Sequence, residues 1–121
     1  MIQSLSFSTD EQYLASLGGQ DDNSLAIWDV QTGKALCGHQ VGMNVANKIR
    51  FFNNTHDKLV TIHNYGMRVW TVDLKLKKVA FNDINTGQIK RKYQCIEINP
   101  DDTSAYLGTL TGDIIVIDLV R

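Results

Sequence analysis

The sequence has 121 residues, of which 43% are hydrophobic and 21% are charged, and its formal net charge is −1. This composition is typical of a soluble globular domain, and it excludes a disordered chain or one whose overall charge would favour nucleic acid. No apolar run, residues 114–117 included, is long enough to cross a bilayer, and the N-terminus lacks the features of a signal peptide.

The two cysteines, Cys37 and Cys95, are 58 positions apart. This spacing indicates neither a disulfide framework nor a zinc knuckle. We therefore expect a reducing compartment and a cytoplasmic location, with no membrane association.

Short apolar bursts with a period of two recur along the whole chain. They occupy residues 5–7, 13–14, 25–28, 49–51, 59–62, 69–72, 96–98, 106–107 and 114–119. Turn-forming residues separate them, which is typical of short strands. No window has a helical stripe, and the single proline, Pro100, falls in an expected turn. The pattern predicts an all-β meander with almost no helix.

The bursts form a repeat. Residues 25–30, 67–72 and 114–119 align with one another, so that Trp70 and Ile117 follow Trp28 at intervals of 42 and 47 residues. A Thr-Gly pair at Thr32-Gly33 is expected to lead into a fourth strand, and a second pair lies at Thr86-Gly87. A period in the low forties with four short strands per unit is typical of propeller blades.

These residues resemble the WD-repeat family. Gly38-His39 matches the Gly-His pair that lies between blades in that family, and Trp28 and Trp70 match the tryptophan that closes the third strand. The resemblance implies an all-β, incomplete propeller of about two and three-quarter four-stranded antiparallel blades. Blade one would span residues 1–38, blade two 39–92, and blade three 93–121, without its fourth strand.

The resemblance also implies a hydrogen-bond network within a blade, which can fix the register of its strands. The residues expected to form it are Ser16, Asp22 and Trp28 in blade one, and His39, Thr61 and Trp70 in blade two. In blade three, Gly108 and Ile117 stand where the family has a Ser or Thr and a Trp. We expect packing to hold that blade.

Within the family the sequence resembles the cilia- and flagella-associated members, which are long double-propeller components of the axonemal doublet microtubule. The segments that carry this resemblance are residues 13–22, 37–38, 42–47, 86–91 and 106–114. It implies part of the first propeller of a structural scaffold, with tubulin and axonemal proteins as partners. A generic WD-repeat adaptor in a cytosolic multiprotein complex fits the blade pattern equally well.

No residue pattern indicates catalysis, a cofactor or a metal site. His39, His56 and His63 lack ligand spacing with a third donor, and the paired aspartates fall in turns that they can cap. We therefore expect a protein that is not an enzyme and that binds other proteins.

One basic cluster is a candidate partner-binding site. It consists of Lys75, Lys77, Lys78, Lys90, Arg91 and Lys92, with only Asp83 among them. We expect these residues on the outer strand of blade two, at residues 77–81, and in the connection to blade three. Lysines there either guard an open strand edge or bind an acidic partner. Nucleic acid is disfavoured because the cluster lacks interleaved aromatic residues for base stacking, and only Phe81 and Tyr93 lie nearby.

The number of blades is too small for a closed propeller, which needs at least four. Either the chain is part of a longer protein, or several copies assemble into a ring. An isolated chain is expected to expose an apolar patch and to self-associate.

Overall fold

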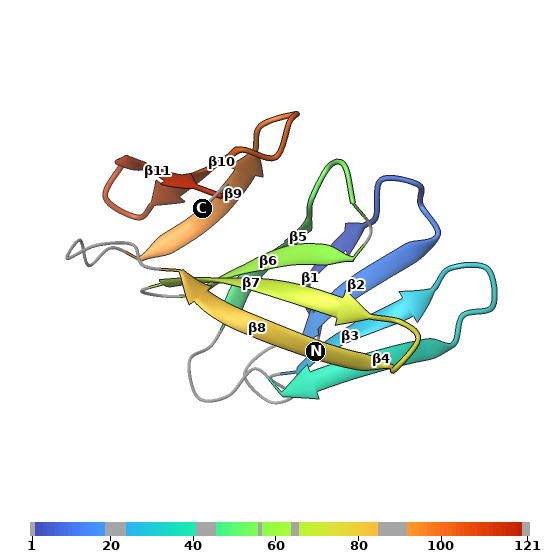
Figure 1. Ribbon diagram of the computed structural model, residues 1–121. Coiled ribbons are helices and arrows are strands. Elements are labelled where there is room, and N and C mark those ends of the chain that lie inside the picture. The colour runs from blue at the N-terminus through green and yellow to red at the C-terminus, as the bar shows by residue number, and fades with distance from the viewer. Residues whose placement is uncertain are drawn as a thin grey trace.

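The computed structural model describes residues 2–18, 24–40, 46–55, 57–63, 66–84 and 92–119. Within these ranges the chain forms eleven strands and no helix, and so it holds no helix that could span a membrane. The strands form three antiparallel sheets. They follow one another in chain order across the molecule, with the second sheet between the first and the third (Figure 1). The expected all-β, incomplete propeller is confirmed.

Each sheet is a meander in which strands that are consecutive in the chain pair with one another. The first sheet contains β1 (Ile2–Phe7), β2 (Tyr13–Gly18), β3 (Ser24–Asp29) and β4 (Ala35–Gln40). The second contains β5 (Ala46–Phe51), β6 (Lys58–His63), β7 (Gly66–Asp73) and β8 (Lys78–Ile84). The third contains β9 (Tyr93–Ile98), β10 (Ser104–Thr109) and β11 (Ile114–Asp118).

Two apolar layers hold the three sheets together, and β6 lies between them. Successive side chains of a strand point to opposite faces. Leu59 accordingly packs into the layer shared with the first sheet, whereas Val60 and Ile62 pack into the layer shared with the third. This double burial explains why the sequence of β6 is an almost unbroken apolar run. The first strands are also in contact, β1 with β5 and β5 with β9.

One expected boundary is wrong. Gly38-His39 does not lie between two blades, because β4 continues to Gln40 and pairs Gly38 with Ala26. A Cβ on Gly38 would lie 3.0 Å from the Leu25 carbonyl oxygen, so this close strand approach favours glycine.

The two Thr-Gly pairs lie at different places relative to the fourth strands. Thr32-Gly33 does lead into β4, and Gly33 has the positive φ of 72° that such a turn needs. Thr86-Gly87 follows β8 and lies outside the described residues. The turn that leads into β8 consists of residues 74–77, and Lys77 there adopts a φ of 54°.

The third sheet differs by one position from the expected alignment. Strand pairing places Ile117 opposite Ala105, as Trp70 lies opposite Leu59, so Ile117 stands at the tryptophan position as expected. Thr61 lies two residues after Leu59 in β6. The residue two after Ala105 in β10 is Leu107, so Leu107 and not Gly108 is the counterpart of Thr61. Leu107 and Ile117 are both buried. The polar pair of the other sheets is therefore replaced by an apolar pair.

Candidate functional site

The first sheet brings Ser16 and Trp28 together across β2 and β3. Trp28 Nε1 donates a hydrogen bond to Ser16 Oγ at 2.9 Å. The indole N–H can only donate, and the hydroxyl oxygen is a suitable acceptor. Asp22, the third residue expected there, lies outside the described residues.

The second sheet brings Thr61 and Trp70 together and adds a histidine that we did not expect. Trp70 Nε1 donates to Thr61 Oγ1 at 2.9 Å, and Thr61 Oγ1 lies 2.9 Å from His63 Nε2. His63 lies two residues after Thr61 in β6, so both side chains share one face. That spacing was the available sequence signal for His63, but the resemblance directed attention to His39.

His39 belongs to an aromatic cluster between the outer strands β4 and β8. Its ring centroid lies 5.5 Å from that of Trp70 and 5.9 Å from that of Phe81. The guanidinium of Arg68 lies 4.2 Å above the Phe81 ring and forms an ion pair of 2.7 Å with Asp83. A cation over an aromatic face is attracted by the ring quadrupole. The cluster therefore packs the outer strand of the first sheet against the outer strands of the second.

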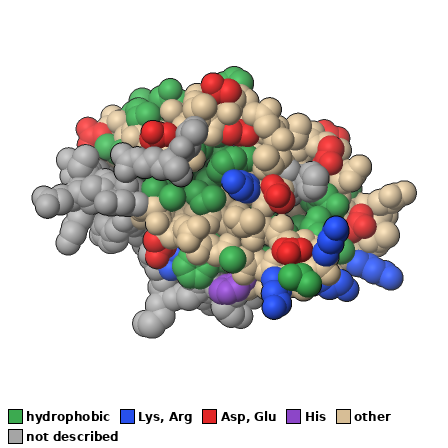
Figure 2. Space-filling view, viewed as in Figure 1, with side chains coloured by type: hydrophobic (Ala, Val, Ile, Leu, Met, Phe, Trp, Pro, Cys, Tyr) green, Lys and Arg blue, Asp and Glu red, His purple; other side chains and the backbone are tan. Residues whose placement is uncertain are grey.

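The basic cluster is divided by the fold. Lys75 and Lys77 lie in the turn between β7 and β8, and Lys78 begins β8. Lys92 precedes β9, beyond the other end of β8, and Lys90 and Arg91 lie outside the described residues. Figure 2 shows basic side chains gathered at the end of the molecule that carries the β7–β8 turn. Lys75, Lys77 and Lys78 thus form one surface without Lys92.

That surface also carries an exposed apolar side chain. Leu76, between Lys75 and Lys77, is 64% exposed. We call Lys75, Leu76, Lys77 and Lys78 the lysine turn. A leucine surrounded by lysines offers an apolar contact and positive charge to the same partner.

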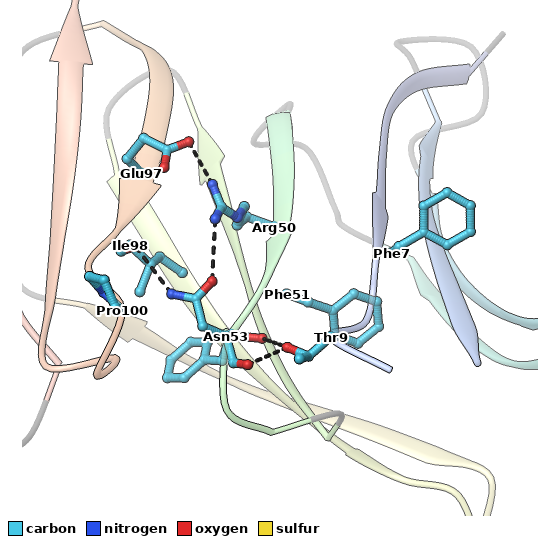
Figure 3. Close-up of a pocket in the computed structure, with 9 residues that line it drawn as sticks. Phe7, Thr9, Arg50, Phe51, Asn53, Glu97, Ile98 and Pro100 are labelled. Carbon is cyan, nitrogen blue, oxygen red and sulfur yellow. Dashed lines mark hydrogen bonds and ion pairs between the residues drawn. The ribbon is translucent and has the colours of Figure 1, made fainter. Parts of the chain in front are cut away.

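A hollow of about 630 Å³ lies between the first strands of the three sheets. Figure 3 shows Phe7 on one side of it and Arg50 on the other, with Thr9 and Asn53 below. Arg50 Nη1 donates to Glu97 Oε1 at 2.6 Å, and Nη2 donates to Asn53 Oδ1 at 3.4 Å. The ion pair neutralises the charge of both side chains, so the hollow has no net charge to select a ligand.

The Cys37 thiol is not activated, and the described residues hold no cluster of metal ligands. Burial raises the pKa of the Cys37 thiol, which disfavours the nucleophilic thiolate. Within the described ranges, no three His, Cys, Asp or Glu side chains gather as metal ligands.

Similar proteins align with nearly the whole chain. The sequence is 47% identical over 120 residues to cilia- and flagella-associated protein 52 of Chlamydomonas reinhardtii. It is 42% and 40% identical, over 117 residues each, to the proteins of that name from Sus scrofa and Homo sapiens. These alignments cover 99%, 94% and 94% of this chain but only 20%, 19% and 19% of the relatives. No protein-family model matches the chain.

Solved β-propellers share its fold. The β-propeller domain of Myceliophteria thermophila Cps50 (Swd1) superposes with a TM-score of 0.78 at 18% identity, covering 98% of this chain and 38% of that one. A chain of the mitotic checkpoint complex superposes with a TM-score of 0.80 at 13% identity, covering 99% of this chain and 36% of that one. At these identities the likeness concerns the fold alone.

Three stacked antiparallel meanders with their first strands in contact, together with this likeness, define the chain as part of a β-propeller. The particular protein that it matches is cilia- and flagella-associated protein 52, of which it spans about a fifth. Both levels of the resemblance drawn from the sequence are confirmed.

Proposed function

We propose that this chain is part of a non-catalytic scaffold that holds other proteins in the axoneme of a cilium or flagellum. Its relatives carry the name cilia- and flagella-associated protein, and a chain with its fold belongs to a multiprotein assembly. A propeller fold by itself hosts many functions, so the binding surface has to carry the proposal.

The lysine turn is the observation that carries it. Lysines that guard a strand edge must lie along that edge. Only Lys78 belongs to the outer strand β8, whereas Lys75 and Lys77 precede it in the turn. Edge protection therefore does not account for Lys75 and Lys77. Exposed Leu76 gives the same turn an apolar anchor, and apolar anchors within a polar rim are typical of protein interfaces.

The partner of the lysine turn is an acidic protein surface, because opposite charge speeds association and selects the partner. The tubulin surface is acidic, and the names of the relatives favour a partner found in cilia. Lys90, Arg91 and Lys92 form a second contact in this proposal, since Lys92 is exposed beyond the far end of β8.

Cosedimentation with microtubules tests this assignment. The double variant Lys75→Glu/Lys77→Glu should bind about tenfold more weakly than the unchanged chain, because it places four units of negative charge change at the contact. Binding of the unchanged chain should also weaken steeply with added salt. The matched control is Lys48→Glu/Lys58→Glu, which makes the same charge change at two exposed lysines of the second sheet.

The control should bind like the unchanged chain. Equal loss in both double variants would mean that net charge, and not the lysine turn, governs binding. If neither variant loses affinity, solubility remains the function of Lys75 and Lys77. Absence of cosedimentation for the unchanged chain would favour the adaptor of a cytosolic complex.

Self-association of the isolated chain is part of the same proposal. Leu5 and Phe7 of β1 are each 56% exposed, and Ile114 and Val116 of β11 are 71% and 57% exposed. Exposed apolar side chains on both outer sheets favour contacts between copies. Sedimentation velocity should therefore show oligomers at micromolar concentration, and a monodisperse monomer would contradict the expectation.

A further inference from the structure

The turns that follow the first strands of the second and third sheets are joined by the carboxylate of Asp102. Its Oδ1 accepts a hydrogen bond from the Asn53 backbone N–H at 2.8 Å. Its Oδ2 accepts from the backbone N–H of Asn54 at 2.8 Å and from Asn54 Nδ2 at 3.0 Å. Hydrogen bonds to an ionised carboxylate are roughly twice as strong as neutral ones. We call this arrangement a clasp: a turn carboxylate that binds two consecutive N–H groups of the preceding sheet.

The same turns are also joined in the opposite direction. Asn53 Nδ2 donates to the carbonyl oxygens of Ile98 at 3.2 Å and Asn99 at 2.9 Å, the first of which is drawn in Figure 3. One sheet earlier, Thr9 Oγ1 donates to the carbonyl oxygens of Phe52 and Asn53. A side-chain donor two residues past the first strand thus reaches the next sheet in both cases. The contact between turns is a repeated feature of the fold.

Glu11 in the first sheet has the position that Asp102 has in the third. Both residues have a positive φ, 60° for Glu11 and 61° for Asp102. The backbone N–H of each bonds to the carbonyl oxygen three residues earlier, Ser8 or Asn99, at 2.9 Å. The two turns therefore follow the same backbone path.

The preceding aspartates agree with this equivalence. Asp10 Oδ1 accepts from the Gln12 backbone N–H at 3.1 Å, and Asp101 Oδ1 accepts from the Thr103 backbone N–H at 3.2 Å. Each aspartate is thus used within its own turn. The residue after it is the one whose carboxylate is available to another sheet.

Glu11 has no neighbouring turn to bind among the described residues. Because Asp102 binds the sheet that precedes its own, the equivalent position of Glu11 lies on the side of the first sheet away from the second. Glu11 is exposed, and within the described part of the chain its carboxylate forms no hydrogen bond or ion pair. Glu11 thus has the backbone conformation of Asp102 and a carboxylate that can accept hydrogen bonds, but no described donor binds it.

We propose that Glu11 forms a further clasp with a propeller blade outside this sequence, whose turn offers two consecutive backbone N–H groups and an amide side chain, as Asn53 and Asn54 do. This inference rests on the propeller fold and is independent of the lysine turn. It identifies the open side of the first sheet as an interface and defines the chemistry of the turn that the interface accepts.

A second copy of this chain does not meet that requirement. Its third sheet would present Pro100 and Asp101 at the positions of Asn53 and Asn54, two and three residues past the first strand. Proline has no backbone N–H. Asp101 would bring a carboxylate toward the carboxylate of Glu11, and like charges at short distance repel. Pro100 also lacks the side-chain donor that Thr9 and Asn53 provide. The clasp therefore does not contribute to head-to-tail assembly of copies, which would rest on the exposed apolar side chains of the outer sheets.

A gain of self-association tests the proposal. The variant Pro100→Asn/Asp101→Asn gives the third sheet the donors of the second, and the amide that replaces the Asp101 carboxylate keeps an oxygen for the Thr103 N–H. Sedimentation velocity should show association at least about tenfold tighter than in the unchanged chain, the change that one added hydrogen bond to a charged group gives. Adding Glu11→Ala should remove the gain.

Two further measurements keep the outcome decisive. The midpoint of thermal unfolding should match that of the unchanged chain, which shows that the double variant folds. If it does not fold, Asp101→Asn alone should give a smaller gain that also depends on Glu11. A gain that survives Glu11→Ala, or no gain in a folded variant, would overturn the proposal. If Glu11→Ala weakened the self-association of the unchanged chain as much as that of the double variant, a second copy would fit the clasp, against the proposal.

Discussion

At the scale of single residues, one hydroxyl orders two buried rings in the second sheet. Trp70 Nε1 can only donate, so Thr61 Oγ1 accepts from it, and the same hydroxyl forms a hydrogen bond with His63 Nε2 whose direction depends on the histidine tautomer. All three side chains are at most 1% exposed. Water cannot replace a lost partner at such a site. Thr61 therefore fixes both ring orientations.

Replacing Thr61 tests this arrangement. Thr61→Val keeps the shape of the side chain but leaves Trp70 Nε1 and His63 Nε2 without their shared partner, so the free energy of unfolding should fall by about 1–3 kcal/mol. Urea denaturation followed by tryptophan fluorescence measures it. The matched control, Thr71→Val, makes the same change at an exposed position of β7 and should cost less than about 0.5 kcal/mol. Equal losses in the two variants would show that the network has no special part in stability.

At the scale of strands, the pattern of apolar bursts predicted which segments pair but not their full extent. An alternating pattern defines the faces of a strand, whereas a shift of one residue depends on pairing with its neighbour. The sequence alignment, made without the strand pairing, placed Gly108 at the position of Thr61. The pairing places Leu107 there. Gly38-His39 was assigned to a connection because it matches the Gly-His pair of the WD-repeat family, yet β4 continues through both residues.

The candidate site was predictable where it rests on resemblance within one sheet. The pairs Ser16 with Trp28 and Thr61 with Trp70 lie on neighbouring strands, and the repeat aligns them. The outer strand of the second sheet was expected at residues 77–81, and β8 begins one residue later at Lys78, so Lys77 belongs to the turn. Contacts between sheets, such as those of Asp102, join residues about 48 positions apart and leave no periodic pattern in the sequence.

The need for glycine in β4 can be tested at the same scale. Gly38→Ala would place a Cβ 3.0 Å from the backbone oxygen of Leu25, which cannot rotate away, so the strands must separate slightly. The free energy of unfolding should fall by about 1–3 kcal/mol, as in overpacked sites. Gly66→Ala is the control, because its Cβ would meet nothing within 4 Å. Denaturant titration of both variants should show a loss only for Gly38→Ala. An equal effect at both positions would refute the steric explanation.

At the scale of the whole molecule, the second sheet differs from the other two in how fully its faces are buried. The second sheet is covered on both faces by apolar layers, and it also carries the lysine turn at its outer edge. The first and third sheets each have one face that is less covered, with Leu5, Phe7, Ile114 and Val116 exposed. A partner that binds the lysine turn would therefore contact the sheet that is buried on both faces.

Amide hydrogen exchange, measured with and without microtubules, tests the central claim most directly. In the free chain the amides of β6 should exchange most slowly, because both faces of this strand are buried. On addition of microtubules, residues 74–78 should gain protection, whereas residues 30–34, in the equivalent turn of the first sheet, should change less. Faster exchange in β6 than in β1 or β11 would contradict the stacked-blade architecture. Protection that omits residues 74–78 would contradict the assignment of the lysine turn as the binding surface.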